Sequence, residues 1–197
     1  GWAEPALTFV GPPTTVLGRA GSLSTISNAG RMTVWGGSGL GYVNRLDNTV
    51  WTFLSNGFAG PGTRSGMNMV YDSARDRTMF FAGGYLGARN DIFYLADTGG
   101  FSDGPAAPAD LFPRAYQSMQ YDSTRDRMVM YGGRTALAQN SQPLGDSWEC
   151  KNERWARINV PPTMTPRIAP AMVYDSLRKQ FVMFGGLDQL NRPLGDT

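Results

Sequence analysis

The stretch Arg114-Ala-Tyr-Gln-Ser-Met-Gln-Tyr-Asp-Ser-Thr-Arg-Asp-Arg-Met-Val-Met-Tyr-Gly-Gly133 decides the fold, and a polar loop joins it to Gly145-Asp-Ser-Trp148. Two short apolar runs flank the turn at 122–127, whose Asp, Ser and Thr side chains favour turns by hydrogen-bonding to nearby backbone. A glycine pair ends the second run, and a third short strand is expected to open at Asp146. Short strands joined by tight turns predict an antiparallel meander, the unit of a small twisted sheet.

The same pattern occurs four times along the chain. Each copy starts at an arginine and closes its second strand with a glycine pair, and these marks lie 17, 19, 18 and 18 residues apart. The arginines are Arg19, Arg64, Arg114 and Arg167, and the glycine pairs are Gly36-Gly37, Gly83-Gly84, Gly132-Gly133 and Gly185-Gly186. Seven residues after the arginines come Ile26, Tyr71, Tyr121 and Tyr174. A period of about 50 residues with a diglycine is a signature of radial or solenoidal arrays.

The repeat resembles the kelch family. The resemblance rests on the diglycine after an apolar strand, on the Asp-Ser-Trp148 or Asp-Thr197 opening of the next strand, and on the downstream Trp155. It covers nearly all of the chain, and it implies an all-β propeller built from four-stranded antiparallel sheets. The Asp-Ser-x-Arg-Asp-Arg turns are similar to those of bacterial kelch proteins, which are often exported, although the sequence leaves the compartment open. The resemblance says little about function.

A single propeller domain over 1–197 is therefore expected, with blades at about 19–63, 64–113, 114–166, and 167–197 joined with 1–18. The last blade is expected to be completed by the N-terminal strand. The third copy continues as Leu144-Gly-Asp-Ser-Trp148, the chain stops at Leu194-Gly-Asp-Thr197, and Trp2 placed after Thr197 would complete the same pattern. Building one blade from both chain ends hides the sheet edges. Four blades in one chain also leave open a larger ring made with a second chain or with further repeats.

Composition and charge exclude several classes of function. The formal net charge is only +2, which argues against a nucleic-acid-binding surface. No apolar stretch approaches the length of a membrane-spanning helix. The single Cys150 rules out an internal disulfide. The chain has no histidine, so a Ser-His-Asp triad, a histidine-ligated metal and a histidine base are all excluded, and kelch-type copper oxidase chemistry with them. No cofactor and no metal site is predicted.

Most of the repeated residues are interpreted as structural. Phosphate-binding glycines open a helix, and no helix is expected after the glycine pairs, so those pairs are assigned to tight turns. The methionines lie largely inside the expected strands, where they fill a core adaptably. Repeated aromatic residues, among them Trp51, Trp148 and Trp155, are expected to pack between blades rather than to form a sugar-stacking surface. The segment 47–51 is expected to open the third strand of the first copy.

The turns Arg75-Asp-Arg77 and Arg125-Asp-Arg127, with Arg178-Lys179, place paired cations at the same edge of three blades. A solvated hairpin tip is the simpler interpretation of these cations. A ring of cations that recognises an acidic partner is the alternative.

The loops after the glycine pairs differ in length and content, and such loops usually carry recognition on a repeated scaffold. Each contains an arginine. The candidate binding residues are Tyr42, Arg45, Tyr85, Arg89, Arg134 and Arg192.

Two functions follow from these patterns. The preferred hypothesis is a non-catalytic propeller that binds another protein, as an interaction module or as an accessory subunit of a larger assembly, with a homodimer among the possible states. The alternative is a carbohydrate-binding or carbohydrate-active kelch protein that uses loop arginines and aromatic residues. Nothing in the sequence argues positively for an enzyme.

Overall fold

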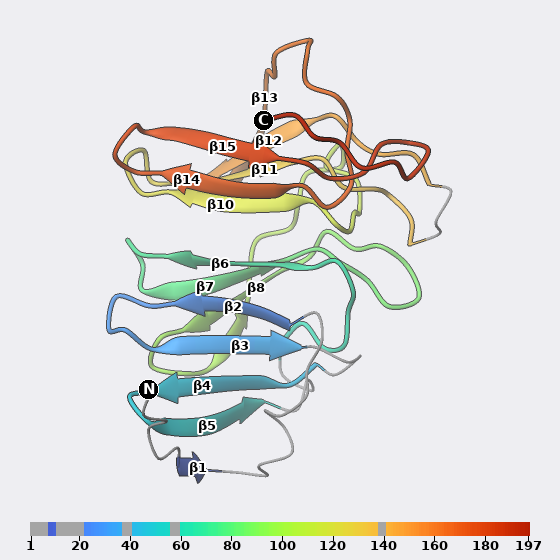
Figure 1. Cartoon of the computed structure of the whole chain (residues 1–197). Coiled ribbons are helices and arrows are strands. Elements are labelled where there is room, and N and C mark those ends of the chain that lie inside the picture. The colour runs from blue at the N-terminus through green and yellow to red at the C-terminus, as the bar shows by residue number, and fades with distance from the viewer. Residues whose placement is uncertain (1–7, 11–21, 37–40, 56–59, 138–140) are drawn as a thin grey trace, which may run out of the picture.

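Fifteen short β-strands make up the part of the chain that the structure, a computed structural model, describes: residues 8–10, 22–36, 41–55, 60–137 and 141–197 (Figure 1). Tight turns and irregular loops join the strands, and these residues include no helix. Within the same ranges there is consequently no helix of the length and hydropathy needed to cross a membrane.

The strands form four sheets, numbered here in chain order. Sheet I consists of β1 (Thr8–Val10), β2 (Ser22–Ile26), β3 (Met32–Gly36), β4 (Val43–Asp47) and β5 (Val50–Ser55). Sheet II consists of β6 (Asn68–Asp72), β7 (Arg77–Phe81), β8 (Ile92–Ala96) and β9 (Phe101–Asp103). Sheet III consists of β10 (Ser118–Asp122), β11 (Arg127–Tyr131), β12 (Ser147–Lys151) and β13 (Arg154–Ile158). Sheet IV consists of β14 (Ala171–Asp175) and β15 (Gln180–Phe184).

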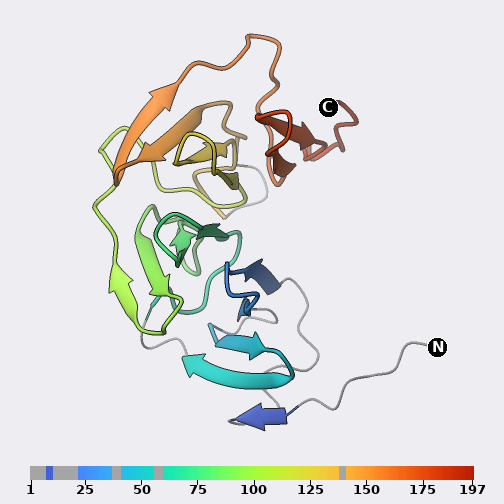
Figure 2. The same cartoon turned by 90° about the vertical axis from the view of Figure 1, so that its left-hand side faces the viewer.

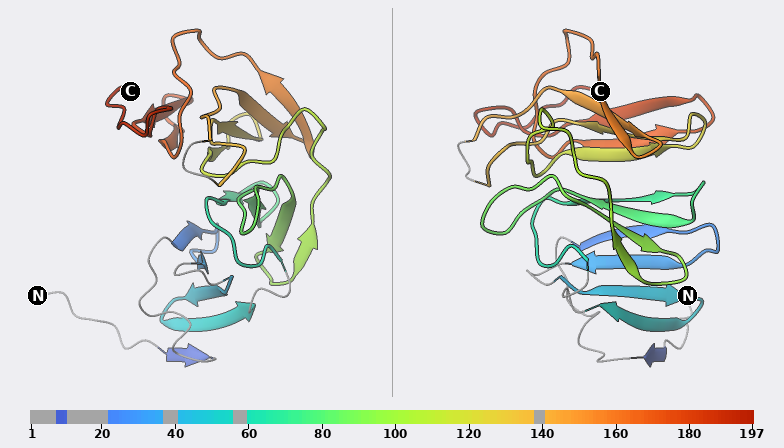
Figure 3. Two further views of the ribbon diagram at one scale, coloured as in Figure 1. Left: turned by 90° about the vertical axis from the view of Figure 1, so that its right-hand side faces the viewer. Right: turned by 180° about the vertical axis from the view of Figure 1, so that it is seen from behind.

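The sheets follow one another along an arc that stays open between sheet I and sheet IV (Figures 2 and 3). Consecutive sheets contact through their first strands, β2 against β6, β6 against β10, and β10 against β14. From β2 onward, strands that follow one another within a sheet pair antiparallel. Each sheet has a front face, which is turned toward the next sheet in the chain, and a rear face, which is turned toward the preceding one.

The core lies between the sheets rather than within any one of them. One buried cluster joins sheets II and III, where Phe81 packs on the Trp155 ring at 4.9 Å between centroids and Trp148 is fully enclosed. A second cluster joins sheets I and II around Trp35 and Phe80. Methionines fill both clusters, as the sequence predicts. Neither face of an inner sheet can be buried without its neighbour, so the sheets stabilise one another.

In the second, third and fourth copies, the arginine that starts the copy is a buried clamp. Arg114 donates from both terminal nitrogens to the two carboxylate oxygens of Asp146, each at 2.8 Å, and its side chain is fully buried. Arg167 holds Asp196 in the same way, at 2.9 and 2.6 Å. Arg64 and Asp91 form the equivalent pair in sheet II. In sheets II and III the clamp ties the segment before the first strand to the residue that precedes the third strand, and in sheet IV Asp196 lies at the corresponding position of the sequence.

The same arginines also satisfy backbone carbonyls at the end of the second strand. Arg114 donates to the carbonyl of Gly132 at 3.1 Å, and Arg167 donates to that of Gly185 at 3.0 Å. The Nε atom of Arg114 bonds the carbonyl of Phe112 at 3.3 Å. Paired, hydrogen-bonded guanidinium groups are the form in which a buried charge is tolerated. One side chain therefore fixes three segments of a sheet.

The glycine pairs carry a left-handed backbone at the end of the second strand. Gly36, Gly132 and Gly185 have φ values of 71°, 72° and 67°. In sheet II the equivalent residue is Ala82, which follows β7 directly and has φ 63°, so that glycine pair lies one position later than in the other copies. This offset explains why the second copy has the longest spacing from arginine to glycine pair.

Two expectations about strand placement are corrected by the structure. β1 pairs parallel with β5 in sheet I and does not complete sheet IV, which has two described strands. Trp2 lies outside the described residues. The segment 47–51 is the hairpin between β4 and β5, and it does not open the third strand. Asn48 has φ 52° in that turn, and Trp51 pairs with Leu46 as Trp155 pairs with Cys150 in sheet III. Trp51 thus occupies the register position of Trp155.

Replacing the clamp arginine is expected to be costly. Arg114→Ala leaves the carboxylate of Asp146 and the carbonyl of Gly132 without their buried donor, and removing one partner of a buried ion pair costs about 3–5 kcal/mol. Urea denaturation measures the loss. Arg154→Ala, on an exposed strand position, is the matched control and is expected to change the free energy of unfolding by less than about 0.5 kcal/mol. Equal effects of the two substitutions would contradict the clamp.

The glycines that follow β11 and β15 test how far close packing adds to the backbone requirement. A Cβ on Gly132 would lie 2.6 Å from the carbonyl oxygen of Arg167, whereas on Gly185 its nearest neighbour is 3.4 Å away. Because the φ values match, Gly132→Ala is expected to cost about 1–3 kcal/mol more than Gly185→Ala in urea denaturation. Equal costs would mean that the backbone dihedral alone selects glycine.

Candidate functional site

The two ends of the sheets differ in what they present. At the turn end, tight hairpins join the first and second strands, at residues 72–77, 122–127 and 175–180. At the loop end, on the right in Figure 1, longer connections leave the glycine pairs and return to the third strands. The clamps lie at the loop end and hold these connections at both of their roots.

A run of left-handed backbone links the sheets at the loop end. Gly66, Tyr116 and Ala169 each lie two residues after a clamp arginine, with φ values of 64°, 59° and 51°. The backbone nitrogen of Tyr116 donates to the carbonyl of Gly66 at 2.8 Å, and that of Ala169 donates to the carbonyl of Tyr116 at 2.7 Å. These bonds pass from one sheet to the next, and they bring Tyr116 and Ala169 to the wall of a cavity.

The cavity has a volume of about 450 Å³ and lies between sheets III and IV at the loop end. Its wall combines cationic, amide, aromatic and aliphatic side chains, from Tyr116, Arg134, Ile168, Ala169, Leu187 and Asn191. The guanidinium carbon of Arg134 lies over the Tyr116 ring at 4.6 Å from its centroid, which stabilises the charge within a largely buried side chain. The volume is within the range of small-molecule sites.

Asp188 fixes the loop beside this cavity. One carboxylate oxygen accepts the backbone N–H groups of Leu190 and Arg192 at 2.8 and 2.9 Å, and the other accepts Nε of Arg192 at 2.8 Å. The backbone donor of Arg192, followed by its side chain, lowers the pKa of Asp188 below its usual value. The Arg192 guanidinium remains 69% exposed and the Leu190 side chain faces solvent.

The connection between β7 and β8 presents apolar side chains to solvent. Gly84 and Ala88 pair across a tight hairpin, and at its tip the exposed fractions of Tyr85 and Leu86 are 70% and 95%. The strand leaving the hairpin is anchored to the next sheet, because Arg89 pairs with Arg114 through backbone hydrogen bonds. The side chain of Phe112, two residues before Arg114, is also exposed. We call the exposed set the loop rim; it comprises Tyr85, Leu86, Arg89, Phe112, Leu190 and Arg192.

The binding candidates taken from the sequence do not form one cluster. Tyr85, Arg89 and Arg192 lie on the loop rim, and Arg134 lines the cavity. Arg45 is not in a loop. It lies in β4, nearly buried, and donates to the carbonyl of Asp97 in sheet II, while burial lowers the pKa of its guanidinium.

Tyr42, the remaining candidate, is half-buried beside β4. Its ring meets that of Phe53 edge-on, with 5.8 Å between centroids. Tyr42 and Arg45 therefore stabilise sheet I and its contact with sheet II, and neither belongs to the loop rim.

Several residues of the loop end escape sequence reasoning. Tyr116 and Ala169 could have been found by their fixed position two residues after a clamp arginine, had the left-handed backbone there been recognised. Tyr85 and Leu86 lie between Gly84 and Gly87, so a short turn that carries two apolar side chains could have been recognised from the sequence. Leu187, Asn191 and Ile168 carry no such signal, because their convergence depends on how sheets III and IV pack.

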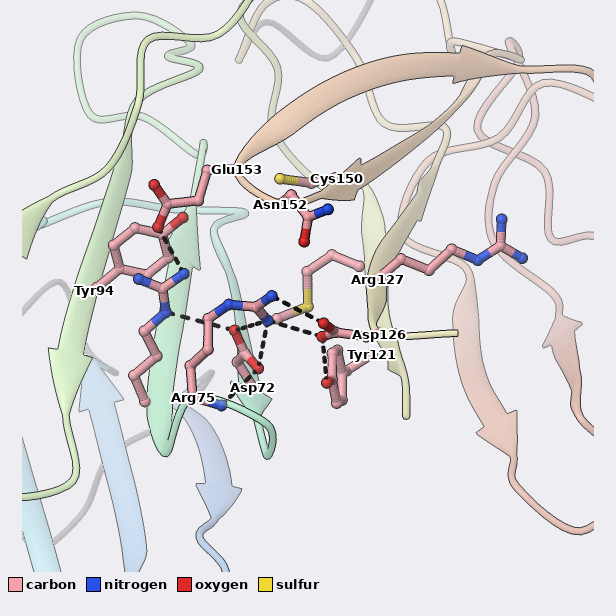
Figure 4. Close-up of a pocket in the computed structure, with 11 residues that line it drawn as sticks. Asp72, Arg75, Tyr94, Tyr121, Asp126, Arg127, Cys150, Asn152 and Glu153 are labelled. Atoms are coloured by element: carbon pink, nitrogen blue, oxygen red, sulfur yellow. Dashed lines mark hydrogen bonds and ion pairs between the residues drawn. The ribbon is translucent and has the colours of Figure 1, made fainter. Parts of the chain in front are cut away.

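The turn end is a network of neutralised charges. Arg75 reaches Asp72 in its own turn at 3.1 Å and Asp126 of sheet III at 2.8 Å, as Figure 4 shows. The hydrogen bond with Asp126 raises the pKa of Arg75, and the same bond lowers the pKa of Asp126. Arg77 bonds Glu153 of sheet III at 2.9 Å, and its guanidinium stacks at 3.6 Å from the Tyr94 centroid. The space these residues enclose is only about 20 Å³.

The turn arginines of sheets III and IV are neutralised in the same manner. Arg125 and Arg127 both contact Asp122, and Arg178 contacts Asp175. The arginines of the turns thus meet carboxylates of the protein itself, which agrees with self-paired hairpins better than with a ring of free cations. Burial raises the pKa of the neighbouring Cys150 thiol to about 12, so the thiol stays protonated and is a poor nucleophile.

Asp122 gives this network a pH dependence. Burial acts to raise its pKa, but hydrogen bonds from donors that include Arg125 and Arg127 overcome that effect and lower the pKa to about 2. A carboxylate whose pKa is lower folded than unfolded stabilises the fold above the unfolded value, and the contribution disappears as the pH falls through the folded value.

Asp122→Asn therefore tests the network by its pH profile. The difference in the free energy of unfolding between wild type and variant is expected to be constant above about pH 4 and to shrink by about 2 kcal/mol as the pH falls to about 2. Urea denaturation at a series of pH values measures it. A difference that does not change with pH would contradict the lowered pKa.

Comparisons with known proteins support the fold and nothing finer. No protein-family model matches the chain, and no curated protein matches it by sequence. Among solved structures the chain is similar to YjhT, with a TM-score of 0.70 over 96% of this chain and 67% of the YjhT chain. The sequence identity is 13%, so the similarity is one of fold alone. This chain has an all-β fold of repeated antiparallel sheets that it shares with YjhT.

Proposed function

We propose that this chain is a non-catalytic, kelch-type propeller segment that binds another protein through the loop rim. The propeller assignment is supported by sheets that follow one another along an arc with their first strands innermost (Figure 2). The kelch assignment is supported by the clamp arginine and the Tyr-Asp-Ser turn, which recur in sheets II, III and IV, and by a glycine pair at or next to the end of the second strand in every copy.

Tyr85 and Leu86 are the observation that carries the binding proposal. A tight backbone bridge holds their hairpin, yet both side chains project into solvent. Exposing a leucine and a tyrosine side by side forfeits the burial energy that either would gain in a core. Tyrosine and arginine are enriched among the residues that dominate binding energy in protein interfaces, and Arg89 follows on the same loop. A protein surface with an apolar pocket is the partner that this tip fits.

The charges at the two ends favour the same choice of surface. The arginines of the turn end are engaged by carboxylates of the protein, so an acidic partner would have to break existing ion pairs to bind there. At the loop rim, Arg192 keeps an exposed guanidinium although it is tethered to Asp188. Interface arginines that are already oriented lose less conformational freedom on binding.

A carbohydrate-binding function is the second candidate, favoured by the cavity beside Asn191. Stacked Arg134 and Tyr116, together with an amide, offer an apolar ring face and hydrogen-bonding groups to a sugar-sized ligand. The volume of about 450 Å³ is sufficient for such a ligand. This function would use the cavity wall, whereas protein binding uses the rim outside it.

The test compares capture of partners by immobilised variants. Tyr85→Ser/Leu86→Ser is expected to lose at least about tenfold in the capture of a partner protein from the source lysate, because both apolar anchors are gone. Lys151→Ser/Arg157→Ser, at exposed positions of the outer strands of sheet III, is the control and is expected to bind as wild type does.

Equal capture by both double variants would contradict the proposal. A rise in melting temperature with a panel of saccharides, lost in Asn191→Gly, would instead support the carbohydrate function. Glycine suits this substitution because Asn191 has φ 57°, so the amide is removed while the backbone is kept.

A further inference from the structure

The front face of sheet IV is apolar and uncovered. Alternate residues of its two strands pair on this face, Ala171 with Phe184 and Val173 with Val182. The exposed fractions of Val173 and Phe184 are 57% and 54%. The opposite, rear face of the same sheet is packed on sheet III through Met172 and Tyr174.

The equivalent face of sheet III shows what this surface normally meets. Tyr131 occupies the position of Phe184 and is only 2% exposed, and Val129 occupies the position of Val182 and is 5% exposed. Both lie on the face turned toward sheet IV, and Tyr131 donates a hydrogen bond to the carbonyl of Thr165 in the segment that leads into that sheet. The front face of sheet IV therefore carries the kind of apolar residues that another sheet covers in sheet III, but here these residues are exposed.

Sheet I presents the complementary surface on its rear face. Ile26, which pairs with Met32, lies on this side and is 61% exposed, with Val34 beside it. The other face of β2 packs on sheet II, where Thr25 contacts Thr78. In the remaining sheets the position of Ile26 is a tyrosine. Two of these tyrosines reach the turn of the preceding sheet: Tyr71 accepts the backbone N–H of Asn28, and Tyr174 bonds Thr124.

A matched exchange of residues links the two uncovered faces. At the junction of sheets III and IV, the hydroxyl of Tyr174 donates to Thr124 at 2.7 Å. In sheet IV the residue equivalent to Thr124 is Leu177, and in sheet I the residue equivalent to Tyr174 is Ile26. A polar Thr–Tyr contact is thus replaced by an apolar Leu–Ile contact if sheet I follows sheet IV. The exposed fraction of Leu177 is 85%, so the leucine has no role in the isolated turn.

We propose that this chain associates head to tail with a second copy of itself, the front face of sheet IV on one copy covering the rear face of sheet I on the other. The association repeats the geometry by which each sheet already packs on the next. It joins unlike surfaces, so the assembly as a whole retains one open face of each kind until it closes.

Complementation between two variants tests this directly. Val173→Lys blocks the front face of sheet IV, and Ile26→Lys blocks the rear face of sheet I. Sedimentation velocity over a range of concentrations is expected to show self-association of the wild type and at least a tenfold weaker association of each variant alone. An equimolar mixture of the two variants is expected to form a dimer and nothing larger, because it contains one intact pair of faces.

The proposal is overturned by a wild type that stays monomeric at all concentrations, or by association that survives either substitution. It is also overturned if the mixture fails to associate, since that result means that like faces pair. Leu86→Lys, on the loop rim, is the control and is expected to associate as wild type does. Matching far-ultraviolet circular dichroism and melting temperature among the variants show that the lysines have not unfolded the chain.

Discussion

The clamp between a buried arginine and an aspartate at the loop end is the interaction on which sheets II, III and IV depend. Its donors hold the start of the first strand, the end of the second and the beginning of the third, so one side chain closes the loop end of a sheet. Because the side chain of Arg114 is fully buried, its charge and its N–H donors have to be paired within the protein. This requirement accounts for the nearly constant spacing of 18 or 19 residues between the arginine and the glycine pair in sheets II, III and IV.

With the loop end closed in this way, the loops themselves are free to vary. The connection after β7 is a short apolar hairpin, whereas that after β15 is ordered by Asp188 acting as a cap. The turn end has no such freedom, because residues such as Arg75 and Tyr71 bond the neighbouring sheets there. Recognition is accordingly favoured at one end of the arc and cohesion at the other.

The repeat pattern predicted most of the strands, because arginine, tyrosine and glycine recur at the same places in the copies that form sheets II, III and IV. It misplaced the third strand of sheet I because Asp47 resembles Asp146, yet Asp47 ends β4 and Asn48 turns the chain. The pairing of β1 with β5 was not predictable, since it depends on proximity in space. Of the candidate site, the loops were predicted but not their contents: burial of Arg45 and exposure of Leu86 are decided by neighbouring sheets.

The hydrogen bonds that pass from Gly66 to Tyr116 and on to Ala169 connect each sheet only to its nearest neighbours. The free energy of unfolding of such an array is approximately the sum of the intrinsic stability of each sheet and the interaction energy of each contact between neighbouring sheets. An inner sheet is held by two junctions and an end sheet by one. Among the described sheets, sheet IV has two strands and takes part in neither buried cluster, so its own terms contribute least, and the two clusters that join sheets I, II and III should hold when it loses order.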